Sequence, residues 1–197
     1  MKQVGPIVLA SASPRRREFF QRLGLKMDVI PSNVAEIEGV GNPQRLPLRV
    51  TVEKLKAVRT KLGPTFRGWI VGADTIVALG REIFGKPKNR IDAKQMLRSL
   101  AGKRHRVYTG YRVQDAKGQF REGGVETAVE MTPMTDAEID WYVATGEPDD
   151  KAGGYAIQGK GAVFVRAIFG SYSNVVGLPL HEVIRALREL GAITDGP

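Results

Sequence analysis

The sequence predicts an α/β or α+β protein built on a mixed β-sheet. Short apolar runs bounded by Gly, Pro and polar residues alternate with longer stretches in which apolar residues have helical spacing. Two longer strand-like segments, 106–113 and 124–131, are joined by the turn 115–118. A length of 197 residues suits one α/β domain or two small lobes around a cleft.

Apolar patterning and helix boundary signals define the elements of the first half. Ser13 is a good N-cap with Pro14 at the first helical position, and Gly24 is a helix stop. We expect a strand over 6–10, a helix over 14–23, a strand over 27–30, a polar loop from residue 32, a helix over 46–62 ended by Gly63 and Pro64, and a strand over 69–71 that runs into 72–75.

The second half follows from the same signals. Thr135 and Glu138 form a capping box that opens a helix, and Gly102 ends another. We expect a hairpin of 76–79 and 82–84 around Gly80, a helix over 91–100, strands over 106–113 and 124–131, a helix from 135 to about 145, a glycine-rich loop over 153–161, a strand over 162–168 and a closing helix over 179–190.

Composition limits the chemistry. The formal net charge of +9 points to an anionic partner, either a nucleic acid or a small polyphosphate, and charge alone favours neither. Without Cys there are no disulfides and no thiolate chemistry, which is compatible with an intracellular protein. Two His exclude a His-rich zinc centre, so any metal would be Mg²⁺ or Mn²⁺ on oxygen ligands. No apolar run could span a bilayer.

The turn into the first helix is the strongest candidate for a ligand site. A helix N-terminus exposes backbone N–H groups and favours anions, yet Arg15, Arg16 and Arg17 occupy its first turn. These cations oppose the helix dipole at a cost of about 0.3–1 kcal/mol each. A bound polyanion would offset that cost. The alternative interpretation is a solvated basic turn.

Two further segments have both a functional and an ordinary interpretation. Asp74 follows an apolar run and Gly72, which indicates an active-site residue at a strand end or a turn Asp bonded to its own backbone. Lys86 is a phosphate contact or a surface lysine. The segment from Gly80 to Lys86 begins like a P-loop, but Pro87 stands where that motif needs Ser or Thr, so we reject a P-loop.

Taken together, these segments resemble the Maf family of nucleoside triphosphate pyrophosphatases nearly end to end. Each tract is moderately specific, and their number and order make the match highly specific. The resemblance rests on 9–16, the pair Glu53–Lys54, 72–75, 85–87, 108–110, 146–148, 150–153, 157–159 and 174–180.

The resemblance implies a single catalytic domain over residues 1–197, with an elongated mixed sheet flanked by helices and two lobes around a central cleft. It implies hydrolysis of a nucleoside triphosphate between the α- and β-phosphates, with a divalent cation, Mg²⁺ or Mn²⁺. Members are typically cytoplasmic and often homodimeric, so we expect a cytoplasmic homodimer with no membrane and no specific nucleic-acid partner.

The resemblance also implies residue roles. Asp74 matches the general base and, with Glu36, the metal ligands, whereas Arg15, Thr75 and Gln158 match positions tied to base preference. Ser13, Arg16, Lys54 and Lys86 complete the substrate-binding set.

Gly-Ala-Asp-Thr at 72–75 with Ile-Gln-Gly at 157–159 is typical of the subgroup that prefers dTTP and UTP. The alternatives are the subgroup that favours 7-methyl-GTP, which has Ser-Asp-Gln where this chain has Ala73, Asp74 and Thr75, and a non-enzymatic nucleic-acid-binding or cell-division regulatory module. Gly154 and Ala156 depart from the family pattern and could alter the loop that presents Gln158.

Overall fold

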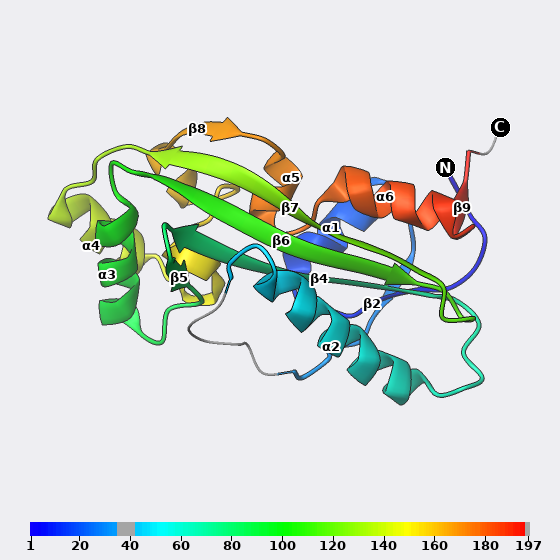
Figure 1. Ribbon diagram of the computed structural model, residues 1–197. Helices are drawn as coiled ribbons and strands as arrows, with labels where there is room; N and C mark the ends of the chain where they lie inside the picture. Colours follow the sequence, from blue (N-terminus) through cyan, green and yellow to red (C-terminus); the bar gives the residue numbers. More distant parts are fainter. Residues whose placement is uncertain (35–41, 196–197) are drawn as a thin grey trace.

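The computed structural model describes residues 1–34 and 42–195. A seven-stranded mixed sheet runs the length of the molecule (Figure 1). Strand β2 is parallel to β3 and β4, and the other pairs are antiparallel. The order is β3-β2-β4-β6-β7-β8, with β5 also on β4: β2 Ile7–Leu9, β3 Met27–Val29, β4 Trp69–Leu79, β5 Glu82–Phe84, β6 Arg104–Gln114, β7 Phe120–Met131 and β8 Val165–Phe169. A separate ribbon pairs β1 Lys2–Gln3 with β9 Ile193–Thr194.

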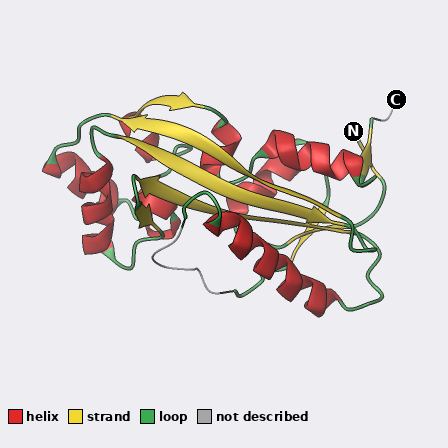
Figure 2. Cartoon of the chain, viewed as in Figure 1, coloured by secondary structure: helices red, strands yellow, loops and turns green. Residues whose placement is uncertain are grey.

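Helices lie against both faces and near both ends of the sheet (Figure 2). They are α1 Pro14–Arg22, α2 Leu46–Leu62, α3 Arg90–Leu100, α4 Asp136–Ala144, α5 Tyr172–Val176 and α6 Leu180–Glu189, with 3₁₀ turns η1 Glu147–Asp150, η2 Ala152–Gly154 and η3 Lys160–Phe164. Among the described residues, no helix is both long enough and apolar enough to cross a membrane.

The two largest hydrophobic cores mark two lobes that share one sheet, while two smaller clusters lie between α2 and the sheet. Helices α1 and α6 pack on one half of the sheet, where Val71 of β4 is buried. Helices α3 and α4 pack on the other half, where Val77 of the same strand is buried. Strand β6 likewise contributes Val113 to the first core and Val107 to the second. The expected elongated sheet with two lobes is therefore confirmed.

Strand β4 changes partner along one of its edges, and this change creates an opening. Residues 69–71 pair with β2 and residues 77–79 pair with β5, while the opposite edge pairs with β6 from Ile70 to Ala78. The expectation that Asp74 ends a strand is wrong, because β6 holds β4 extended through that position. The strand that ends nearby is β2, at Leu9.

Two glycines allow α2 to approach the sheet closely. A Cβ atom at Gly110 would lie 2.2 Å from the backbone N of Leu48, and one at Gly72 would lie 2.0 Å from Cδ1 of Leu55. Side chains at these positions would push the helix outward. The glycines thus bring α2, which carries Lys54, against β4 and β6.

Most predicted boundaries agree with the structure. The helix over 46–62 and the capping box of Thr135 and Glu138 are confirmed. The strand expected over 162–168 begins only at Val165, because residues 160–164 turn as 3₁₀ helix. Strands β1 and β9 and helix α5 were not predicted, since each is too short to show a hydrophobic period.

Candidate active site

A cavity of about 780 Å³ lies where the lobes meet. This volume is in the range of about 300–1,000 Å³ typical of small-molecule sites. Every predicted site residue within the described chain lines it, whereas Glu36 falls outside the described residues. The lining set is Ser13, Arg15, Arg16, Lys54, Asp74, Thr75, Lys86 and Gln158.

A largely buried ion pair joins α2 to β4 at this cavity. The Nζ atom of Lys54 lies 2.5 Å from Oδ1 of Asp74, and the two side chains are 12% and 14% exposed. Asp74 lies on the part of β4 that is paired with neither β2 nor β5. The carboxylate is therefore oriented by a cation while its residue still lines the cavity. Such a group can accept a proton or bind a cation.

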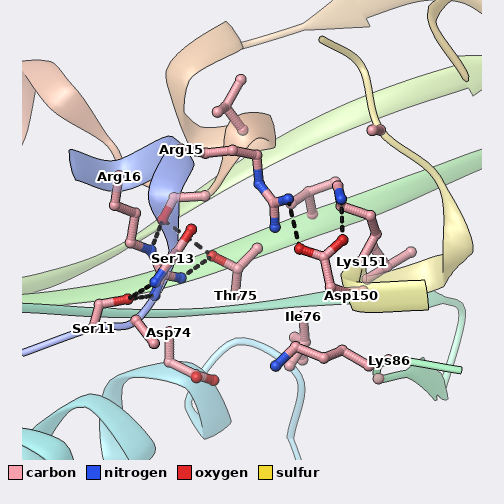
Figure 3. A pocket seen from close by; sticks show the side chains of 18 of the residues that line it. Ser11, Ser13, Arg15, Arg16, Asp74, Thr75, Ile76, Lys86, Asp150 and Lys151 are labelled. Carbon is pink, nitrogen blue, oxygen red and sulfur yellow. Dashed lines mark hydrogen bonds and ion pairs between the residues drawn. The ribbon is translucent and has the colours of Figure 1, made fainter. Parts of the chain in front are cut away.

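The buried guanidinium of Arg16 locks the N-terminal turn of α1 to the rest of the site. Its Nε donates to the Gly177 carbonyl (2.7 Å), Nη1 to Ser11 Oγ (2.9 Å) and Nη2 to Thr75 Oγ1 (3.1 Å). Thr75 Oγ1 also lies 2.9 Å from Thr109 Oγ1. Figure 3 shows Arg16 pointing toward Ser11 and Thr75. The resemblance includes Gly177 within 174–180, but nothing in the sequence indicates that its carbonyl accepts from Arg16, 161 residues away.

The first turn of α1 differs from the prediction in two ways. Arg15 and Arg16 line the cavity, but Arg17 is exposed and does not, because successive helical side chains point in different directions. Ser13 occupies the N-cap position with extended backbone, yet its side chain accepts no capping hydrogen bond. Its own N–H donates to Ser11 Oγ (3.2 Å), and the residue lines the cavity instead.

One carboxylate connects two cations across the cavity. Arg15 Nη1 lies 3.2 Å from Asp150 Oδ2, and Lys151 contacts the other oxygen of Asp150 (Figure 3). Burial alone would raise the pKa of Asp150, but Lys151 and Arg15 outweigh it, so the pKa lies below its usual value. Arg15 is 135 residues from Asp150 in the sequence, so only the fold could show this bridge.

Lys86 and Gln158 reach the cavity from the second lobe. Lys86 follows β5, and its side chain extends toward the side of the cavity where Asp74 lies (Figure 3). The Gly85 carbonyl accepts from the N–H of Gly153 (2.9 Å), which ties this segment to the glycine-rich loop. Gln158 is exposed in that loop. The segment from Gly80 forms the expected hairpin, which confirms the rejection of a P-loop.

The donor chemistry fits a hard divalent cation. Among the described residues, no group of three or more His, Asp or Glu side chains gathers as a metal cage. Mg²⁺ instead uses one or two carboxylates together with water and substrate phosphates. Asp74, which lines the cavity beside cationic residues, offers such a carboxylate.

The fold and the sequence both match known proteins. The Staphylococcus aureus Ham1 protein has a similar fold, with a TM-score of 0.51 and 14% identity over 92% of this chain and 98% of that one. A dTTP/UTP pyrophosphatase from Anaeromyxobacter dehalogenans strain 2CP-C is 49% identical over 94% of both chains. One from Thermococcus kodakarensis is 44% identical over 94% of this chain and 96% of that protein. The family model described as Maf-like protein matches residues 6–190. This chain therefore belongs to the Maf family.

Proposed function

We propose that this chain hydrolyses nucleoside triphosphates, with preference for UTP and dTTP, to a nucleoside monophosphate and pyrophosphate. One observation carries the proposal: a single cavity is lined by Asp74 and by the cations Arg15, Arg16, Lys54 and Lys86. A triphosphate needs such concentrated positive charge, and hydrolysis needs a nearby group that accepts a proton.

Asp74 acts as the general base in this proposal. A carboxylate oxygen of Asp74 takes a proton from water as the water oxygen bonds to the α-phosphorus. The bond from that phosphorus to the α–β bridging oxygen breaks, and pyrophosphate leaves with the bridging oxygen. The ion pair with Lys54, 2.5 Å long, supports this role because it fixes the orientation of the carboxylate.

The cations act on the phosphates. Arg15 and Lys86 come from opposite lobes and bind phosphate oxygens, Arg15 through its fork of N–H groups and Lys86 as a point charge. Arg16 lines the cavity and is also a positioning residue. Three of its nitrogen atoms donate hydrogen bonds to acceptors in the protein. Asp74 would hold a divalent cation together with substrate phosphates, and such an ion supplies charge stabilisation at the α-phosphate.

The direct test is incubation with UTP, dTTP, CTP, GTP and 7-methyl-GTP in Mg²⁺ or Mn²⁺, with separate assays for pyrophosphate and orthophosphate. We expect pyrophosphate alone, fastest from UTP and dTTP, and none after chelation by EDTA. Orthophosphate as the first product would contradict the proposed bond cleavage. Salt-dependent binding of DNA or RNA without any pyrophosphate would favour a nucleic-acid-binding module instead.

The location and assembly of the protein also belong to the proposal. We propose a cytoplasmic enzyme that acts as a homodimer and takes a free nucleotide rather than a nucleic acid. Size-exclusion chromatography with light scattering tests the dimer directly.

A further inference from the structure

The loop that carries Gln158 is fixed at both ends by two side chains that do not line the cavity. Glu147 of η1 accepts hydrogen bonds from the backbone N–H of Lys160 on Oε2 and of Gly161 on Oε1, each 2.9 Å long. The Tyr142 hydroxyl accepts from the N–H of Ala156 at 3.0 Å. Ala156 precedes Gln158 by two residues and Lys160 follows it by two. The anchors therefore flank this residue symmetrically.

The two anchors are themselves joined. The Tyr142 hydroxyl donates to Oε1 of Glu147 at 2.8 Å, so the carboxylate, the phenol and three backbone N–H groups form one network. Tyr142 is fully buried and packs edge-on against Phe164, with ring centroids 5.6 Å apart. The network thus rests on the core of the second lobe.

Two glycines make room for the network. A Cβ at Gly159 would lie 2.1 Å from Oε2 of Glu147, and one at Gly161 would lie 2.5 Å from the Tyr142 hydroxyl oxygen. The loop backbone therefore lies directly on the two side chains. Burial alone would raise the pKa of Glu147, but the N–H groups of Gly161 and Lys160 with the Tyr142 hydroxyl outweigh it and lower the pKa.

We propose that Glu147 and Tyr142 are positioning residues that set the placement of Gln158 and thereby the selectivity for the nucleotide base. This inference rests on the proposed function and on the resemblance, which ties Gln158 to base preference. An amide side chain discriminates between bases only if its donor and acceptor are held in place, since a freely moving amide can pair with several bases. The network holds the backbone of the loop, while the cations and Asp74 on other elements act on the phosphates.

The test uses Glu147→Gln and Tyr142→Phe, each nearly unchanged in shape. Glu147→Gln turns one acceptor into a donor that faces a donating backbone N–H, and Tyr142→Phe removes the hydroxyl that joins Ala156 to Glu147. Gln158→Ala provides the reference for lost base contact. The matched controls are Glu189→Gln and Tyr172→Phe, because both residues are exposed on other helices.

The first measurement is the ratio of kcat/KM for UTP to that for CTP. We expect both network variants and Gln158→Ala to lower this ratio by about 5- to 50-fold, the size of a lost or frustrated hydrogen bond. We expect kcat for saturating UTP to change less than the ratio. The double variant Glu147→Gln/Gln158→Ala should lose no more selectivity than Gln158→Ala alone, because both changes act through one contact. Additive losses would overturn the proposal.

The second measurement is hydrogen exchange of the loop amides, which needs no activity. The amides of Ala156, Lys160 and Gly161 should exchange faster in both network variants than in the wild type and the controls. Faster exchange with an unchanged UTP/CTP ratio would reduce the network to a structural role and overturn the inference. Unchanged exchange would overturn it as well. Pyrophosphate release by the wild type is measured first. If it released none from any nucleotide, that result would refute the proposed function rather than this inference.

Discussion

Lys54 on α2 and Asp74 on β4, which are twenty residues apart in the sequence, form a 2.5 Å ion pair at the wall of the cavity. The pair depends on the close packing of α2 on the sheet at Gly72 and Gly110. Backbone packing therefore determines the position of the proposed general base.

Asp74→Asn should abolish most of the activity and keep the fold. The amide is nearly the same size as the carboxylate but cannot accept the proton from water, so we expect kcat to fall by about 10²- to 10⁴-fold. Pyrophosphate release gives the rate, and circular dichroism checks the fold. Asp140→Asn, at an exposed position on α4, is the matched control. Activity close to that of the wild type would exclude Asp74 as the base.

Gly110→Ala should damage the site from a distance. The new Cβ would lie 2.2 Å from the backbone N of Leu48, so α2 must move and take Lys54 with it. We expect a loss of about 1–3 kcal/mol in the free energy of unfolding and a higher KM. Gly124→Ala is the control. Gly124 lies on β7 and pairs with Gly110 of β6, but a Cβ atom at Gly124 would meet nothing closer than 3.6 Å. Equal effects of the two substitutions, measured by urea denaturation and kinetics, would contradict this explanation.

Asp150→Asn should tighten nucleotide binding. The carboxylate of Asp150 pairs with Arg15 and Lys151, so it competes with phosphate for both cations. Exposed ion pairs contribute about 0.2–1 kcal/mol, which corresponds to a KM for UTP lower by about 1.5- to 5-fold. The effect should shrink as salt is added. The neighbouring Asp149→Asn serves as the control. A KM that rises would mean that Asp150 holds Arg15 in its binding position.

Acid should destabilise the protein through His105 before most carboxylates titrate. His105 is buried on β6 beside the Tyr155 hydroxyl (2.7 Å), and burial lowers its pKa from 6.5 to about 4. Between pH 6.5 and pH 4, His105 therefore binds a proton in the unfolded chain but not in the folded chain. The contribution of His105 to the free energy of unfolding is therefore fully present above pH 6.5. It falls as the pH drops, by about 2 kcal/mol between pH 7 and pH 5. Urea denaturation at the two pH values measures this loss.

The variant His105→Gln isolates that contribution. Its stability should change much less between pH 7 and pH 5, whatever its absolute stability, because the titrating group is gone. His181→Gln, at an exposed position on α6, should keep the wild-type dependence. If the full dependence persisted in His105→Gln, another group would have to cause it.

The local signals in the sequence were sufficient for most elements. The helix over 46–62 was predicted to the residue because Leu, Val and a terminal Gly-Pro mark its face and its end. The eight predicted site residues of the described chain were chosen because the resemblance and the basic turn at Arg15 and Arg16 pointed to them, and all eight line the cavity.

What the sequence could not provide is pairing over long separations. Nothing local indicates that Arg16 binds the Gly177 carbonyl or that Asp150 bridges to Arg15. The position of Asp74 within β4 was also missed, because pairing with β6 overrides the low strand propensity of Gly and Asp. These features arise only when distant segments are packed together.

Strands β4, β6 and β7 pass uninterrupted through both lobes. Within residues 1–34 and 42–195, the lobes are therefore joined by a continuous ladder of backbone hydrogen bonds, which bending between them would break. The cavity lies where these lobes meet, so we expect it to adjust to a ligand through side chains and surface segments rather than through hinge motion of whole lobes.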